Sequence, residues 1–446
     1  MTITINSFEE LDNFLNYVEA LNDDDAMRKH WLTLKLNPLI FKDFAEKIKK
    51  LDPFTDQYYS LIQDFFGYLQ GCKYHISNEG LLIDVELMTH VGYPYSTRSP
   101  ATVGAFLIAY GFIIKTMNVP IPARILDIGT GVGALTQHLA KMGYDLTCVD
   151  VNDDFLEVIR RASKGLPNRV DCVLSNMEEL DLKQKFDAVL FMESFHHSLN
   201  HRETLKKAIN HLKPNGIIVF AAEPIIKSET DYLPYPWGPR LDGESIRAIR
   251  KHGWIELGFS ESYFYEMLHK SGLQAQRFSS SETHWADVII ARPYKSLKLG
   301  KSLSMRAGQE GTFALLSGWS QPEPFGTWTD GSSPTIRFIV EDTPETYQQL
   351  QLNFELIPFL AFTHTEQQIK VFINEHHAET WLFNGTESTE EKRTIIFLKE
   401  FLDESKVINI RFQISSPISP SSLGLSNDTR QIGLGLISIS LDAWRK

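Results

Sequence analysis

Cysteine is scarce in this sequence of 446 residues, which contains only Cys72, Cys148 and Cys172. Their odd number, wide spacing and apolar or strand-like surroundings exclude a disulfide framework and a cysteine-based metal site. A basic segment followed by an apolar core is also missing after Met1, so no secretion signal is predicted. We therefore expect reduced core cysteines and a cytoplasmic protein.

Long apolar runs and an excess of positive charge are absent as well. The most apolar stretch, residues 103–114, is too short to span a bilayer and predicts a buried helix, so we expect no integral membrane segment. Lysine and arginine together number 44 against 56 aspartate and glutamate residues, which gives a net charge of -12. An acidic chain of this kind is not expected to bind nucleic acid through non-specific phosphate contacts.

The chain is longer than one hydrophobic core usually serves, and its patterns predict three regions. Residues 1–90 carry apolar residues at helical spacing and predict a helical cap. Residues 91–294 alternate between strand and helix patterns, which predicts an α/β domain with a Rossmann-like, doubly wound and mostly parallel sheet. One of its last two strands should run antiparallel at an edge. The seven strands are expected at 123–128, 145–150, 169–174, 186–191, 216–221, 274–279 and 286–291.

Residues 307–446 follow a linker at 295–306 that is rich in lysine, glycine and serine. Short alternating runs separated by turn residues predict an all-β, jelly-roll-like sandwich here. Its strands are expected at 311–317, 335–340, 351–357, 368–373, 394–398, 407–414 and 432–441.

The central motif is an apolar strand that ends in Gly129, Gly131 and Gly133 and leads into a helix pattern. Glycine lets the backbone turn sharply and leaves no Cβ in the way of a ligand. The spacing is tighter than the G-x-G-x-x-G of dinucleotide sites, and Asp127 precedes the turn. A carboxylate there repels a pyrophosphate but suits a ligand with an ammonium group, while Asp150 after the next strand suits ribose hydroxyls.

Residues 191–201 follow the fourth strand and are rich in histidine. Histidine titrates near neutrality and can take the proton of an alcohol nucleophile, so His196 or His197 is the predicted catalytic base. Glu193 is predicted to orient the base or to bind the substrate. No metal site is predicted, because the two histidines are adjacent and no thiol or carboxylate completes a set at helical spacing.

Two loops are predicted to contact ligands. After the fifth strand, an aromatic, proline-rich stretch suits a pyranose ring, because sugars stack on aromatic rings and offer hydroxyls to charged groups. The predicted substrate residues are Glu223, Tyr235, Trp237, Arg240 and Asp242. Upstream of the glycine turn, the loop 90–100 is predicted to bring Tyr95 over the cofactor and Arg98 to its carboxylate. A structural loop that packs on the helix at 101–116 is the alternative.

Together these motifs resemble the class I S-adenosylmethionine-dependent methyltransferases over residues 93–292. The resemblance implies S-adenosylmethionine as the cofactor and assigns a part of it to each motif. The implied contacts are Asp127, Gly129 and Gly131 at the methionine part, Asp150 at the ribose, Asn176 and Met177 at the adenine, and Met192 and Glu193 at the sulfonium and the substrate.

The segments 92–100, 193–197 and 233–243 look like a bacterial subgroup of these enzymes that is associated with surface-polysaccharide synthesis. The segments 318–331 and 419–430 are similar to carbohydrate-binding-like sandwich modules of polysaccharide enzymes. The resemblance implies O-methylation of a sugar hydroxyl on a nucleotide sugar or a surface glycan. Methylation of carbon or nitrogen, or a non-catalytic scaffold in a polysaccharide assembly complex, is the alternative. Homo-oligomers and contacts with other polysaccharide-synthesis enzymes stay open.

Overall fold

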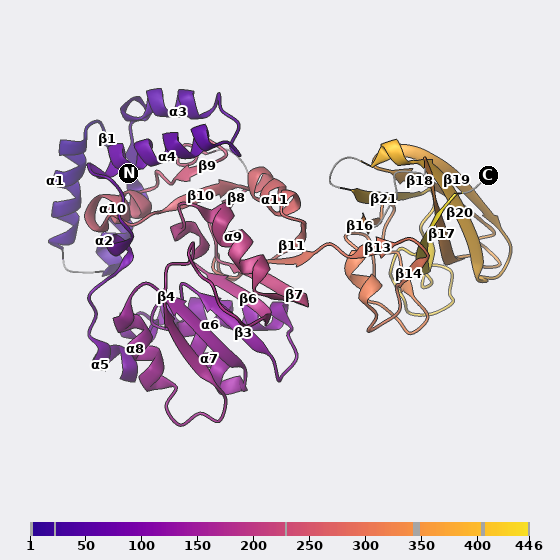
Figure 1. The fold of residues 1–446 in the computed structure, drawn as a ribbon, viewed down its shortest axis with the longest axis horizontal. Coiled ribbons are helices and arrows are strands. Elements are labelled where there is room, and N and C mark those ends of the chain that lie inside the picture. The colour runs from indigo at the N-terminus through magenta and orange to yellow at the C-terminus, as the bar shows by residue number, and fades with distance from the viewer. Residues whose placement is uncertain (1–2, 22–23, 228–229, 342–347, 403–405, 445–446) are drawn as a thin grey trace. The chain divides into compact units, whose positions relative to one another are not determined.

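A seven-stranded sheet occupies the centre of residues 1–293 in the computed structural model, which describes the chain except for residues 1–2, 22–23, 228–229, 342–347, 403–405 and 445–446 (Figure 1). The strand order is β11-β12-β7-β6-β3-β4-β5. The strands are β3 (Arg124–Ile128), β4 (Asp145–Asp150), β5 (Val170–Leu174), β6 (Phe186–Met192), β7 (Leu212–Ala221), β11 (Leu273–Ser279) and β12 (Asp287–Pro293). All seven predicted strands are confirmed.

Five neighbouring strands of this sheet, from β7 to β5, are parallel, whereas β12 is antiparallel to both β7 and β11. The antiparallel strand therefore lies one place inside the edge, which corrects the prediction of an antiparallel edge strand. The sequence of β6 is apolar apart from Asp187. Such continuous apolar runs suit parallel strands that are buried on both faces.

Alternate residues of β3 enter two different hydrophobic cores, because strand side chains alternate between the two faces of a sheet. Ile125 packs on one face with residues of α6, α7 and α8. Leu126 and Ile128 pack on the other face with α9 and with helices from residues 1–90. The helices of the sheet are α6 (Pro100–Met117), α7 (Ala134–Met142), α8 (Asp153–Ala162) and α9 (His201–Asn210).

By length and composition alone, α6 is long and apolar enough to cross a membrane. Its side chains Phe106, Tyr110, Ile113 and Met117 are buried in the core beside the sheet. Leu107 and Ile108 on the same helix are exposed, so the prediction of a buried helix holds for one face of α6 only.

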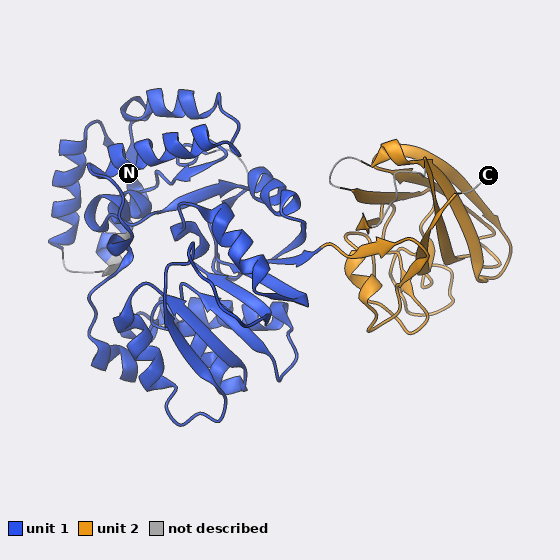
Figure 2. Ribbon diagram, in the orientation of Figure 1, with its two compact units in different colours: residues 1–293 blue, residues 294–446 orange. Residues whose placement is uncertain are grey.

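Residues 1–90 do not form a unit of their own, because they share one core with the sheet and with residues 225–270. In one of these contacts, the Tyr58 hydroxyl donates to the carbonyl of Trp237 over 2.7 Å. The chain divides into two units, residues 1–293 and 294–446, so the boundary predicted at residue 90 separates no compact unit (Figure 2). The elements are β1 (Ile3–Ile5), α1 (Phe8–Glu19), α2 (Asp24–Thr33), β2 (Leu34–Leu36), η1 (Pro38–Ile40), α3 (Lys42–Ile48), α4 (Asp56–Gln70), η2 (Ile76–Glu79) and α5 (Val85–His90).

A small sheet of order β8-β10-β9 lies between β7 and β11 in the sequence. Its middle strand is parallel to β8 and antiparallel to β9. This segment adds a second layer above the carboxyl ends of the main strands, where α4 and α10 also lie (Figure 1). Its elements are β8 (Ile225–Ile226), β9 (Trp237–Pro239), α10 (Gly243–His252), β10 (Leu257–Ser260) and α11 (Glu261–Lys270).

Residues 294–446 form two sheets around a shared hydrophobic core. One has the order β13-β16-β21-β18-β19, and the other has the order β14-β22-β17-β20 with β15 paired to β22. Side chains alternate between buried and partly exposed along β17, the pattern of a sheet with one face in a core. The strands are β13 (Ser296–Lys298), β14 (Lys301–Ser304), β15 (Thr327–Trp328), β16 (Thr335–Glu341), β17 (Gln349–Pro358), β18 (Glu366–Ile373), β19 (His376–Asn384), β20 (Glu391–Leu398), β21 (Val407–Ile414) and β22 (Leu434–Ala443).

Two predictions for this second unit are wrong. The stretch predicted as a strand at 311–317 is mainly the 3-10 helix η5 (Glu310–Ala314). The predicted linker at 295–306 contains β13 and β14, which pair with β16 and β22 in the two different sheets. The sequence does not predict β19, because its first residues are polar and only its second half alternates. A jelly-roll-like connection of the strands stays a prediction.

Candidate functional site

The turn after β3 holds three glycines in the left-handed region, with φ of 70° at Gly129, 52° at Gly131 and 75° at Gly133. A Cβ on Gly129 would lie 2.5 Å from the Cβ of Ser194, so no side chain fits there. A Cβ on Gly131 would meet no atom within 4 Å, because this residue faces a cavity. The turn thus brings bare backbone to the cavity wall.

The cavity lies at the carboxyl ends of β3, β4 and β6, the edge at which sheets of this kind bind ligands. Seven of the residues predicted from the sequence line it, namely Gly129, Gly131, Asp150, Asn176, Met177, Glu193 and His197. The structure therefore joins the glycine turn, the carboxylate of Asp150 and one of the two histidines in a single space.

Asp150 is held in place at the wall of this cavity. The backbone N–H of Gly131 donates to its Oδ2 over 2.9 Å, and the N–H of Asn152 donates to its Oδ1 over 2.9 Å. Burial raises the pKa of this carboxyl, and the two N–H groups partly counter that effect. A carboxylate fixed in this way is suited to accept hydrogen bonds from two adjacent hydroxyls.

Asp127 lies beneath the cavity and does not line it. Its Oδ2 accepts a hydrogen bond of 2.5 Å from the Thr136 hydroxyl, and the residue is 3% exposed. Burial raises its pKa to about 7. Its contact in the structure is with the first turn of α7, so its predicted place along the methionine part is corrected to one behind the cavity wall.

The remaining lining of the cavity suits S-adenosylmethionine, the cofactor that the sequence implies. Asn176 and Met177 follow β5, and Phe155 adds an aromatic ring from α8. This end of the cavity is mostly apolar, with amide and backbone groups at its border, as a flat heterocycle requires. A glycine cradle, a fixed carboxylate and an apolar end therefore fit an adenosyl group that carries no phosphate.

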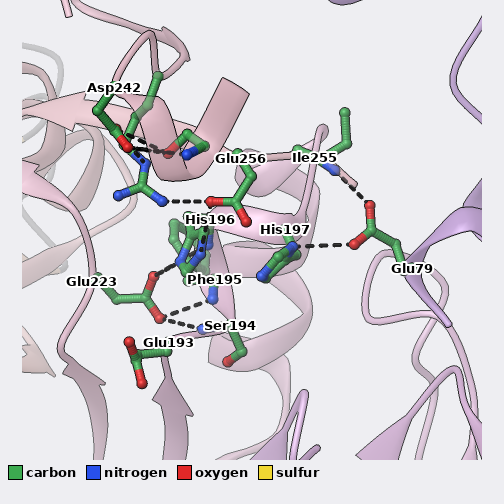
Figure 3. Close-up of polar contacts among 12 residues, drawn as sticks. Glu79, Glu193, Ser194, Phe195, His196, His197, Glu223, Asp242, Ile255 and Glu256 are labelled. Carbon is green, nitrogen blue, oxygen red and sulfur yellow. Dashed lines mark hydrogen bonds and ion pairs between the residues drawn. The ribbon is translucent and has the colours of Figure 1, made fainter. Parts of the chain in front are cut away.

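Two histidines stand on the 3-10 helix η4 (Phe195–His197) near this cavity (Figure 3). His196 is buried, and its Nδ1 donates to Oε2 of Glu223 over 2.8 Å. The other oxygen of Glu223 accepts the N–H groups of Ser194 and Phe195, each over 2.9 Å. Burial alone would raise the pKa of Glu223, but His196 and these N–H groups hold it below its usual range. Glu223, predicted to bind substrate, thus supports the turn that carries both histidines.

His197 lines the cavity, and its Nδ1 lies 3.1 Å from Oε2 of Glu79 in η2, an ion-pair contact without the geometry of a hydrogen bond (Figure 3). Burial disfavours the charged ring, but Glu79 and Glu256 outweigh that effect and raise the pKa of His197 to about 9. The sequence predicts no site residue in 1–90, because nothing around Glu79 links it to a histidine so far along the chain.

Glu256 is a second carboxylate that sequence analysis misses. It precedes β10, forms an ion pair with the Arg240 guanidinium and lies 3.8 Å from Nε2 of His196. One atom each of His196, His197 and Glu256 lie within 4.8 Å of one another, a set that could hold a metal by residue type. Each of the three already has a protein partner, and the guanidinium on Glu256 would repel a cation.

Glu193 follows β6 with a φ of 49°, which is uncommon for a residue with a side chain. Its Oε1 accepts a hydrogen bond of 3.0 Å from the Trp285 indole. The side chain lines the cavity and is open to solvent there, and the surrounding protein together with the carboxylate of Glu223 raises its pKa to about 7. A carboxyl that titrates near neutrality can orient or deprotonate an acceptor.

The predicted aromatic substrate loop is corrected to a packing segment. Tyr235 and Trp237 are almost completely buried. The indole of Trp237 donates to the Pro53 carbonyl over 3.0 Å. Neither ring is open to a ligand. The aromatic rings in the cavity wall are those of Phe155 and Trp254, and sequence analysis predicts neither, because aromatic residues can either pack or bind.

The other predicted residues lie outside the cavity lining. Arg240 is engaged with Glu256, and Asp242 caps α10 by accepting the Ser245 N–H over 3.0 Å. Tyr95 and Arg98 are exposed at η3 (Tyr95–Thr97), a short turn before α6. Met192 packs against the core on the α6 face. The structure therefore does not bring these side chains to the cavity.

Comparison with known proteins points to the same region of the chain. Residues 126–220 match the family described as a methyltransferase domain. The ubiquinone biosynthesis O-methyltransferase of Paramagnetospirillum magneticum is 36% identical over 97 residues, which cover 22% of this chain and 39% of that protein. The enzyme of the same name from Rickettsia conorii is 29% identical over 98 residues, 22% of this chain and 34% of that protein. The chain thus spans well under half the length of these curated relatives.

Among solved structures, the chain matches the 1,6-didemethyltoxoflavin-N1-methyltransferase of Burkholderia thailandensis with bound 1,6-didemethyltoxoflavin and S-adenosylhomocysteine. It is 18% identical with a TM-score of 0.32, and the similarity covers 48% of this chain and 91% of that one. The support for a methyltransferase domain around the glycine turn is the family match over residues 126–220, which lie within the Rossmann-like sheet described above.

Proposed function

We propose that this chain, through its class I S-adenosylmethionine-dependent methyltransferase domain, methylates a hydroxyl group of a sugar. The observation that carries the proposal is that His197, paired with Glu79, opens onto the same cavity as the glycine turn and Asp150. The bound cofactor would supply a methyl group on a cationic sulfonium. An alcohol attacks such a methyl group only when its proton is removed, and a histidine beside the cofactor cavity is suited to that task.

The residues of the cavity divide into two groups by chemistry. Gly129, Gly131, Asp150, Asn176 and Met177 would hold the cofactor, since they supply bare backbone, a ribose acceptor and an apolar end. Four other residues of the lining could contact the methyl acceptor. They are Glu79, Glu193, His197 and Trp254. An indole face with carboxylates beside it suits a sugar ring that stacks and offers hydroxyls.

His197 is the better of the two predicted bases in this proposal, because it lines the cavity while the ring of His196 is enclosed between Glu223 and Glu256. Glu193 would orient the acceptor hydroxyl from the same cavity. Arg240 and Asp242 would act through the ion pair on Glu256 and the cap of α10 rather than by contact.

The acceptor class is proposed from the sequence resemblance to enzymes of surface-polysaccharide synthesis. A nucleotide sugar or a growing glycan in the cytoplasm would be the substrate, and the two-sheet unit of residues 294–446 would bind carbohydrate. The three cysteines are free thiols, and because Cys148 is buried while Cys172 is half-buried and Cys72 is exposed, the prediction of three core cysteines is corrected. Other polysaccharide-synthesis enzymes and a second copy of the chain are proposed partners.

The proposal is tested by titrating S-adenosylmethionine into the protein and by incubating the protein with labelled cofactor and a panel of nucleotide sugars and oligosaccharides. We expect saturable binding in the calorimeter and label on a sugar oxygen, identified by mass spectrometry of the product. No binding of the cofactor would favour the scaffold alternative. Label on a carbon or nitrogen atom of the product would show that the methyl acceptor is not a sugar hydroxyl.

Chelation of metals is expected to leave the rate of methyl transfer unchanged. The three groups that could bind a metal form ion pairs with Glu223, Glu79 and Arg240 instead. The measurement is the initial rate before and after treatment with EDTA and desalting. A rate that falls and recovers on addition of Mg²⁺ or Zn²⁺ would contradict this expectation and assign the His-His-Glu set to a cation.

A further inference from the structure

We propose that Glu79 is a positioning residue for methyl transfer: its carboxylate forms an ion pair with the Nδ1 side of the His197 ring, holds the ring by charge and leaves Nε2 as the nitrogen that exchanges the acceptor's proton. This inference rests on the proposed function. It assigns a role in the chemistry to residues 1–90, which lie outside the matched methyltransferase region at 126–220.

The geometry of Glu79 is that of a fixed group. Its side chain is 8% exposed, and its Oε2 lies 3.1 Å from Nδ1 of His197. Its other oxygen accepts the backbone N–H of Ile255 over 2.7 Å (Figure 3). The Tyr74 hydroxyl also faces Glu79, and burial together with this carboxylate raises the pKa of that hydroxyl. Glu79 is thus anchored on both sides before it meets His197.

Several charged groups surround the His197 ring from different elements. They are Glu79 on η2, Asp150 at the end of β4, His196 next to it on the chain, Glu223 after β7, and Glu256 before β10 with Arg240 attached. Glu193 lines the same cavity. Among the described residues, the carboxylate within ion-pair distance of His197 is that of Glu79. The other carboxylates are occupied by backbone N–H groups, an indole, the His196 ring or a guanidinium.

This arrangement predicts two effects on His197. A negative charge 3.1 Å from Nδ1 favours the tautomer with the proton on that nitrogen, so Nε2 carries the lone pair. The negative charge also stabilises the imidazolium that forms when Nε2 accepts a proton, as in other carboxylate-histidine pairs. Removal of the charge must therefore lower the pKa of His197.

The experiment compares the wild-type protein with Glu79→Gln, which keeps the size of the side chain and an acceptor for the Ile255 N–H. The imidazole resonances are titrated by NMR in the free protein, and His197 is assigned by the signal that disappears in His197→Asn. We expect a midpoint near 9 for the wild type and a decrease of about 1–3 pH units in Glu79→Gln. The rise of kcat/KM with pH should move to lower pH by the same amount.

Glu86→Gln is the matched control, because Glu86 is an exposed carboxylate of the same region whose ion pairs are with His90 and Arg161. It should leave the His197 midpoint unchanged. Glu79→Asp keeps the charge and should retain most of the raised midpoint, and it serves where Glu79→Gln fails to fold. A wild-type midpoint at or below 6.5, or the same midpoint in Glu79→Gln as in the wild type, would overturn the proposal.

The NMR titration needs neither cofactor nor acceptor, so it separates this proposal from the proposed function. A wild-type protein that transfers no methyl group to any sugar would remove the proposed function while the midpoints still test the pairing of Glu79 with His197. A purely structural role of Glu79 would lower thermal stability but leave the pH profile of kcat/KM in place.

Discussion

Replacement of His197 by alanine is expected to lower kcat/KM for methyl transfer to a sugar hydroxyl by ~10²–10⁴-fold, the usual contribution of a general base. The ring lines the cofactor cavity and is the group there that is paired with a carboxylate for proton exchange. The measurement is the initial rate with labelled cofactor at several acceptor concentrations. Urea unfolding checks that the variant is folded.

Two further variants sharpen this result. His90→Ala removes an exposed histidine of α5 and should leave the rate unchanged. His196→Ala should act first on stability, by about 1.5–3 kcal/mol, because it removes the ring that binds the buried Glu223. If kcat/KM of His197→Ala stays within tenfold of the wild-type value, His197 is not the catalytic base. The acceptor would then be a nucleophile, such as an amine, that needs no base.

Gly129→Ala is expected to abolish measurable cofactor binding and to destabilise the fold by about 2–5 kcal/mol. Its Cβ would lie 2.5 Å from the Cβ of Ser194, and its φ of 70° is strained for any residue with a side chain. Overpacking of about 1–3 kcal/mol and a left-handed cost of about 1–2 kcal/mol combine here. Urea unfolding and calorimetry with S-adenosylmethionine measure the two effects.

Gly131→Ala provides the comparison for this prediction. Gly131 also has a positive φ, 52°, but a Cβ there meets no atom within 4 Å. The substitution Gly131→Ala should lower the free energy of unfolding only by the cost of a left-handed backbone conformation, about 1–2 kcal/mol. Equal destabilisation by the two variants would show that the contact with Ser194 relaxes and that the close approach of the turn to η4 is not needed.

Most of the main sheet could be read from local patterns. A run such as β6 is apolar on both faces because the strand is buried on both faces, and that information lies within seven consecutive residues. The glycine turn is equally local, since Gly129, Gly131 and Gly133 need positive φ wherever the chain turns so tightly. The failures at 295–306 and 311–317 concern short stretches without a clear period.

The residues of the site also differ in whether local sequence predicts their position. Gly129, Gly131, Asp150 and His197 follow strands of a parallel sheet, so their meeting at one edge follows from the order of the strands. Trp237 and Trp254 show the limit of such reasoning. Both are aromatic residues of one long insertion, and only the packing of α4 over that insertion buries Trp237 and leaves Trp254 at the cavity.

By itself, the sequence determined the strand-turn-helix unit, the alternation that forms the sheet and the place of the histidines at its edge, because each depends on residues that are neighbours in the chain. The tertiary structure alone decided that Glu79 meets His197, that Glu256 joins His196, and that residues 1–90 belong to the site. These contacts form between elements far apart in the chain. Their partners are set by how helices and strands pack, which no local spacing records.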